Sequence, residues 1–142
     1  MNLAFDLDDC LVATSEANRL AYLDAGVVIP QEARYMPGRS WGVSEESLRR
    51  KVARYPYHLK RSGRLLPAGE LFQTTGGTIL TGASMESAKI VCEMFDLRPM
   101  QIIGGLTPDD KIEWFWASRP GVYFDDWAWM GSNVMENTRW QA

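Results

Sequence analysis

The sequence predicts an α/β fold in which a parallel sheet of about four strands carries helices on both faces, with a small helical insertion after the first strand. After residue 76, short apolar segments alternate with helical patterns, which is typical of parallel β-α-β units. Residues 13–75 are mostly helical in pattern. At 142 residues the chain has room for one such core. We therefore divide it into a core, residues 1–12 and 76–142, and an insertion, residues 13–75.

The first strand is expected at "NLAF", residues 2–5, and two helices are expected in the insertion that follows it. Residues 15–25 form the first helical pattern, which Gly26 closes. The second pattern covers residues 44–55, with Ser44 as its N-cap, because a serine side chain can accept a hydrogen bond from the first turn. Prolines interrupt the rest of the insertion at Pro30, Pro37, Pro56 and Pro67.

Three further strands are expected in the core, at "GTILTGAS", "MQIIGG" and "VYFDD". Two helices alternate with them. The first covers residues 84–96 and begins at Ser84, a favoured N-cap residue. The second covers residues 107–118, with Thr107 as its cap and Pro108 in the first turn, where proline is favoured.

Composition and charge restrict the class of protein. The formal net charge is −3, which argues against a protein that coats nucleic acid, because such proteins are usually basic. The two cysteines, Cys10 and Cys92, are far apart in the sequence and lack the CxxC spacing of a zinc site. No apolar segment is long enough to span a membrane, and the N-terminus lacks a signal-peptide pattern. We expect a cytoplasmic protein without a membrane partner.

Polar side chains collect where the predicted strands end. Ligands of open α/β sheets bind beyond the carboxyl ends of the strands, so these side chains are expected to converge on one crevice. Carboxylates so close repel one another unless a cation or a proton holds them. Oxygen ligands suit Mg²⁺, which also takes substrate phosphate, so we predict an Mg²⁺ site. The converging residues are Asp6 and Asp8 after the first strand, Thr81 after the second, Asp125 and Asp126 after the fourth, and Lys111 in the preceding helix.

The order of these motifs resembles that of the haloacid dehalogenase-like (HAD) superfamily of phosphohydrolases, which has a Rossmann-like core. The segments "AFDLDDCL", "TILTG" and "VYFDD" match its first, second and fourth motifs, and Lys111 matches its third. Each motif is weak alone, since a DxD pair at a strand end is often part of a turn. The four motifs together, in this order, are more specific.

The resemblance implies a role for each of these residues. Asp6 is similar to the family's nucleophile, and Asp8 to the acid/base that protonates the leaving oxygen and later activates water. Thr81 would hydrogen-bond the transferred phosphoryl group, and Lys111 would offset its negative charge. The implied metal ligands are Asp6, the backbone carbonyl of Asp8, Asp126 as a direct ligand, and Asp125 close to the metal or bound through water.

Three features depart from the family's pattern. Asp9 stands where the family usually has glycine, and Cys10 where it usually has threonine or valine. The chain also ends soon after the fourth motif, so the fifth core strand common in the family is expected to be absent. Residues 127–137 are expected as a short last helix. These departures leave open a binding module that keeps the fold without turnover.

The predicted function is an Mg²⁺-dependent phosphatase that hydrolyses a phosphomonoester through an aspartyl-phosphate intermediate. Asp8 favours phosphate chemistry, because dehalogenases of the superfamily lack the second aspartate of the first motif. The insertion stands where the family has its C1 caps, which usually close over small substrates, so a small phosphorylated substrate is expected. The compact helical insertion and the "TPDDK...FDD" ending resemble those of 5′(3′)-deoxyribonucleotidases, and a nucleotide base could stack on Trp41, Tyr55 and Tyr57.

A basic segment of the insertion raises an alternative. Residues 45–64 contain seven Lys or Arg against two Glu. A basic helix face is expected from Arg49, Arg50, Lys51 and Arg54. This face is either simply solvated or attracts an anionic substrate. An anionic substrate that this face attracts could be the end of a nucleic acid. A nucleic-acid-end phosphatase is therefore the alternative function.

Overall fold

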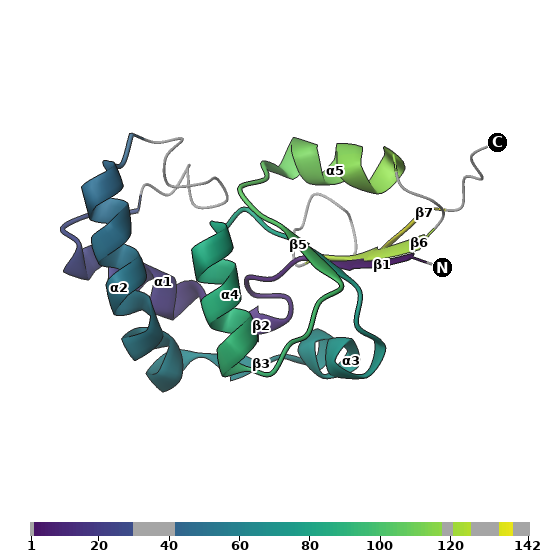
Figure 1. Ribbon diagram of the computed structural model, residues 1–142, viewed down its shortest axis with the longest axis horizontal. Helices are drawn as coiled ribbons and strands as arrows, with labels where there is room; N and C mark the ends of the chain where they lie inside the picture. The colour runs from purple at the N-terminus through teal and green to yellow at the C-terminus, as the bar shows by residue number, and fades with distance from the viewer. Residues whose placement is uncertain (1, 30–41, 118–120, 126–133, 138–142) are drawn as a thin grey trace.

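Four parallel strands form the centre of the sheet: β1 (Asn2–Phe5), β4 (Thr78–Leu80), β5 (Gln101–Ile103) and β6 (Gly121–Phe124). The computed structural model describes residues 2–29, 42–117, 121–125 and 134–137. The strands follow the order β5-β4-β1-β6 (Figure 1). Phe5 of β1 lies opposite Ile79 on one side and Phe124 on the other. The predicted α/β fold with about four parallel strands is therefore confirmed.

A fifth strand extends the sheet where a short helix was expected. β7 (Val134–Asn137) pairs antiparallel with β6. The helix predicted over residues 127–137 is therefore wrong at 134–137, and so is the expected absence of a fifth strand. Residues 127–133 lie outside the described part of the chain. Pairing with β6 satisfies backbone groups that an edge strand would leave open, and four residues are too few to show periodicity.

Two core helices begin at the predicted caps. α4 (Met85–Met94) follows Ser84, whose side chain accepts a hydrogen bond from the N–H of Ser87 at 3.2 Å. α5 (Pro108–Ala117) follows Thr107, whose hydroxyl oxygen accepts one from the N–H of Asp110 at 3.2 Å. Among the described residues, no helix is both long enough and apolar enough to cross a membrane.

Helices cover both faces of the sheet, as predicted. α5 lies on one side and α3 (Pro67–Thr75) on the other (Figure 1). Ala4 packs in the cluster beneath α5, together with Phe115. Phe5 packs in the cluster on the opposite face, where its ring meets that of Phe72 edge-on, with centroids 5.1 Å apart. Neighbouring residues of a strand point to opposite faces, so β1 contributes to both clusters.

Two long helices of the insertion pack side by side, α1 (Ser15–Asp24) and α2 (Glu45–Ser62), as Figure 1 shows. α2 was expected to end at residue 55, but it continues through Pro56. A proline in a helix removes one hydrogen-bond donor and strains the preceding turn. Tyr55 and Leu59, on either side of this proline, are both buried, and their packing stabilises the longer helix.

Three short elements of the insertion were not predicted. β2 (Val12–Ala13) and β3 (Arg64–Leu65) pair antiparallel and bring the two ends of the α1–α2 segment together. α3 begins with a proline in its first turn, a favoured position. Gly69 of α3 lies against the backbone of Leu11, where a Cβ atom would come within 2.2 Å of the carbonyl oxygen. The division into core and insertion remains a prediction.

Candidate active site

The carboxylate of Asp6 and the ammonium of Lys111 meet at the carboxyl end of β1. The backbone N–H of Asp6 donates to the carbonyl of Phe124 at 2.8 Å, which continues the β1–β6 pairing up to the site. Lys111 Nζ lies 2.8 Å from Asp6 Oδ1, and the two side chains are only 12% and 6% exposed. They are 105 positions apart in the sequence, so the fold brings them together.

Asp125 joins this pair from the end of β6. Its side chain is 2% exposed, and its Oδ2 lies 4.0 Å from Lys111 Nζ. The hydroxyl of Tyr123 donates a hydrogen bond to the same oxygen. Burial alone would lower the pKa of Lys111, but the carboxylates of Asp6, Asp125 and Asp8 raise it above its ordinary value. Lys111 is therefore a charged ammonium between two carboxylates.

Two hydroxyl groups hold the carboxylate of Asp8. Thr14 Oγ1 donates to Oδ1 at 2.7 Å, and Thr81 Oγ1 donates to Oδ2 at 3.4 Å. Thr81 follows β4 and is fully buried, and its oxygen also accepts a hydrogen bond from the N–H of Ala83 at 3.1 Å. The structure thus brings Thr81 to Asp8. The contribution of Thr14 was not predicted from the sequence.

Asp9 has a backbone conformation that favours glycine, the residue that the family usually has there. Its φ is +59°, in a region that aspartate tolerates better than most residues. Its Oδ1 accepts hydrogen bonds from the N–H groups of Thr14 at 3.0 Å and Ser15 at 3.2 Å, and its Oδ2 accepts one from the Ser15 hydroxyl. The carboxylate therefore caps the start of α1 while the turn keeps its shape.

α2 adds a buried cation beside Asp8. Lys51 is 6% exposed, and its Nζ lies 4.5 Å from the ring centroid of Tyr55 and 4.9 Å from that of Tyr22. Burial lowers its pKa to about 8, and the carboxylate of Asp8 partly opposes this shift. The prediction that Lys51 shares one helix face with Arg49, Arg50 and Arg54 is therefore wrong, because those three are exposed and Lys51 is buried. Helical spacing indicates this, since Lys51 shares a helix face with Leu48 and Tyr55.

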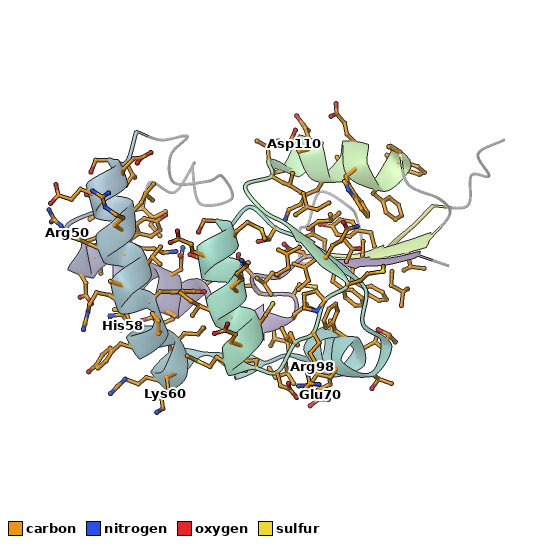
Figure 2. All side chains as sticks on the ribbon, viewed as in Figure 1. Arg50, His58, Lys60, Glu70, Arg98 and Asp110 are labelled. Atoms are coloured by element: carbon orange, nitrogen blue, oxygen red, sulfur yellow. The ribbon has the colours of Figure 1, made fainter. Side chains whose placement is uncertain are left out.

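The arginines of the expected basic face do lie at the surface of α2. Arg49, Arg50 and Arg54 are exposed, and Figure 2 shows Arg50 on the outer side of the helix. Arg50 forms an ion pair with Glu46 at 2.7 Å, and Arg54 forms one with Asp24 at 2.9 Å. These acidic partners offset part of the positive charge, so the face attracts anions less than its arginine count suggests.

The ring of Tyr55 is not available to stack on a base, contrary to the expectation from the sequence. It is 2% exposed, and its hydroxyl forms a hydrogen bond with the side chain of Thr14. Tyr57 is 45% exposed, but the guanidinium carbons of Arg54 and Arg61 lie 4.6 Å and 3.5 Å from its ring centroid. The described aromatic residues of α2 therefore do not favour a nucleotide over other phosphate esters.

The predicted metal site is described only in part. Asp126 and Trp41 lie outside the described residues. Within the described ranges, no three side chains of His, Cys, Asp or Glu are grouped so that they could hold a metal ion. The carboxylates of Asp6, Asp8 and Asp125 offer oxygen donors only, which is the chemistry that Mg²⁺ prefers. Mg²⁺ binding and the roles of these residues therefore stay predictions.

Comparisons with known proteins identify similar structures but no similar sequences. No protein-family model matches the chain, and no curated protein matches it either. A hydrolase from Pseudomonas syringae is 17% identical, over 77% of this chain and 60% of its own, with a TM-score of 0.50. CbbY from Rhodobacter sphaeroides, solved in complex with phosphate, is 16% identical, over 73% of this chain and 63% of its own, with a TM-score of 0.54.

A third structure, the HAD-hydrolase YfnB from Bacillus subtilis bound to magnesium, is 13% identical, over 72% of this chain and 64% of its own, with a TM-score of 0.44. The chain thus spans between 60% and 64% of the length of these structures. The sequence identities are low, so the similarity concerns the fold. The chain therefore shares the Rossmann-like α/β fold of the first two structures.

Proposed function

We propose that this chain, built on the fold of HAD-type hydrolases, is an Mg²⁺-dependent phosphatase that hydrolyses a small phosphomonoester through an aspartyl-phosphate intermediate. The observation that carries the proposal is the position of Lys111, whose ammonium lies between the carboxylates of Asp6 and Asp125 at the ends of adjacent strands. A preorganised cation at this point can stabilise the negative charge that gathers when a carboxylate attacks a phosphate.

In the proposed reaction Asp6 is the nucleophile. One oxygen of its carboxylate attacks phosphorus, the bond from phosphorus to the leaving oxygen breaks, and Asp8 gives that oxygen a proton. Asp8 then takes a proton from a water molecule, which attacks the aspartyl phosphate and releases inorganic phosphate. The hydrogen bond from Thr14 supports this role, because it fixes one oxygen of Asp8 and leaves the other to exchange the proton.

The remaining groups would bind and neutralise the phosphate. When phosphate binds, the Thr81 hydroxyl would turn from Asp8 Oδ2 and donate to the transferred phosphoryl group, and Lys111 would offset the charge of that group. When bound, Mg²⁺ would neutralise negative charge on the nucleophile and the phosphate. Its proposed ligands are Asp6, the backbone carbonyl of Asp8, Asp126 directly, and Asp125 close by or through water.

We infer that the insertion, residues 13–75, caps this site. The support is a set of contacts from α2: Lys51 is buried close enough to Asp8 to respond to its charge, and Tyr55 is hydrogen-bonded to Thr14, which in turn donates to Asp8. A cap of two helices suits a small phosphate ester. The end of a nucleic acid is the second candidate substrate. Its support is the exposed arginines of α2, which is weakened because Arg50 and Arg54 are paired with Glu46 and Asp24.

Hydrolysis of a simple aryl phosphate, with Mg²⁺ and with EDTA, tests the proposed activity. We expect turnover with Mg²⁺ that EDTA abolishes. A folded chain that hydrolyses no member of a panel of phosphomonoesters would overturn the phosphatase and favour a binding module. The same panel separates the substrate candidates, because activity on a nucleic-acid end should fall steeply with salt and activity on a small ester only slightly.

A further inference from the structure

We propose that Tyr123 is a positioning residue, which acts on the reaction by fixing the carboxylate of Asp125. The inference rests on the proposed function, because it concerns the same site. Tyr123 belongs to β6 and lies two positions before Asp125, so strand geometry places both side chains on one face. Its hydroxyl donates a hydrogen bond to Asp125 Oδ2. The last torsion of an aspartate is broad, so such a hydrogen bond favours one orientation of its carboxylate.

Packing gives the ring of Tyr123 little freedom to move. The residue is 0% exposed and belongs to the core cluster beneath α5. Its ring centroid lies 5.8 Å from that of Phe115, with an angle of 36° between the ring planes. A ring enclosed at the density of a protein core holds its hydroxyl at one point. The hydroxyl therefore donates to the carboxylate of Asp125 from a fixed position.

The hydrogen bond is the first link of a chain of contacts that ends at the proposed nucleophile. Asp125 Oδ2, which accepts from Tyr123, also faces Lys111 Nζ at 4.0 Å, and Lys111 Nζ lies 2.8 Å from Asp6 Oδ1. A rotation of Asp125 would move a full negative charge relative to Lys111 and the proposed metal. Hydrogen-bond partners of metal-binding carboxylates typically contribute roughly 10-fold to 100-fold in metal affinity or activity.

A role in packing alone would not require the hydroxyl. Phenylalanine would occupy nearly the same volume in the cluster beneath α5, and burying a hydroxyl costs free energy unless it is hydrogen-bonded. At Tyr123 the hydroxyl does have a partner, and that partner is a carboxylate of the site. The polar atom is thus placed where it can orient a charged group.

The test compares Tyr123→Phe with Tyr57→Phe, a control that also removes a phenol hydroxyl. Tyr57 is 45% exposed on α2, and its ring lies against the guanidinium groups of Arg54 and Arg61. Mg²⁺ affinity is measured by calorimetry on the full chain, and kcat and KM are measured with an aryl phosphate. We expect Tyr123→Phe to weaken Mg²⁺ binding roughly 10-fold to 100-fold and to lower kcat more than it changes KM. Tyr57→Phe should leave Mg²⁺ affinity unchanged.

A double-mutant cycle with Asp125→Asn identifies the route of the effect. Tyr123→Phe should have little further effect on Mg²⁺ affinity in the Asp125→Asn chain, because the hydroxyl acts through that carboxylate. If the effects of the two substitutions on Mg²⁺ affinity were fully additive, the inference would be overturned. The inference would also be overturned if Tyr123→Phe had the same Mg²⁺ affinity and the same kcat as the wild type. The proposed function would still stand in that case. A wild-type chain that neither binds Mg²⁺ nor hydrolyses a phosphomonoester would overturn both. If Tyr123→Phe does not fold, Tyr123→Met repeats the test with a flexible apolar side chain.

Discussion

Lys111 Nζ lies 2.8 Å from Asp6 Oδ1, so a charged donor is in direct contact with the proposed nucleophile. Both side chains are nearly buried, and charges interact more strongly there than at a protein surface. Removal of one partner would leave the other charge buried and uncompensated. In the proposed function this contact offsets the charge of the phosphate, and in the folded chain it neutralises Asp6.

Replacing Lys111 by glutamine should impair both properties. We expect kcat for phosphomonoester hydrolysis to fall by roughly 10²-fold or more, because the developing negative charge loses its cation. The free energy of unfolding should fall by a few kcal/mol, up to about 5, because Asp6 and Asp125 remain buried. Steady-state kinetics and urea unfolding measure the two effects. Lys89→Gln, at an exposed position of α4, is the control. Unchanged kcat in the folded Lys111→Gln chain would contradict the assignment.

Replacing Lys51 by methionine should stabilise the free protein at neutral pH. Burial lowers the pKa of Lys51 from its ordinary 10.5 to about 8, so the folded chain holds this proton less tightly than the unfolded chain. Below pH 8 both states are protonated, and the cost of burying the charge is complete, roughly 3 kcal/mol. Between pH 8 and pH 10.5 the folded state loses the proton first, so the stability of the wild type rises relative to that of the variant.

Urea unfolding of the wild type and of Lys51→Met at several pH values measures this prediction. The variant should be more stable at pH 7, and its advantage should shrink as pH rises from 8 to 10.5. Arg49→Met is the control, because Arg49 is an exposed cation on the same helix. An advantage that is independent of pH would show that the ammonium of Lys51 is not the cause.

Replacing Asp9 by alanine should destabilise the chain by about 1–3 kcal/mol. The variant loses the cap of α1, and it must also hold alanine at a positive φ. Asp9→Asn should retain most of the stability, because an amide oxygen can accept the same hydrogen bonds and asparagine tolerates this backbone region. Asp9→Gly should fall between them, since glycine relieves the backbone but cannot cap. Equal urea midpoints for the alanine and asparagine variants would contradict the capping role.

Helices that begin at a capping residue could be predicted from the sequence. α4 and α5 begin at Ser84 and Thr107 because these side chains cap the first turn, and such caps are visible in a few consecutive residues. β7 could not be predicted, because residues 134–137 form a strand only by pairing with β6. α2 passes Pro56 because the helix packs against α1, a contact that the local pattern does not contain.

In the candidate site, too, some features follow from local sequence and others depend on how distant segments pack. Asp6, Asp8 and Asp125 come directly after strands, and the geometry of a parallel sheet brings the ends of its strands to one edge, so their convergence could be predicted. The inward position of Lys51 depends on how α2 packs, although its helical spacing from Tyr55 indicates the buried face. The hydrogen bond from Thr14 to Asp8 depends on the turn between them and has no sequence pattern of its own.

The central claim is that Asp6 carries the phosphoryl group during turnover, and trapping that group tests it most directly. The wild-type chain is mixed with Mg²⁺ and an aryl phosphate and denatured in acid within its first turnovers, and the peptide that contains Asp6 is analysed by mass spectrometry. We predict one phosphoryl group on Asp6 in the wild type. In folded Asp6→Asn we predict none, with turnover lower by at least about 10³-fold, because the amide cannot form the acyl phosphate. Turnover close to that of the wild type in folded Asp6→Asn, with no phosphoryl group on the wild-type peptide, would contradict the account.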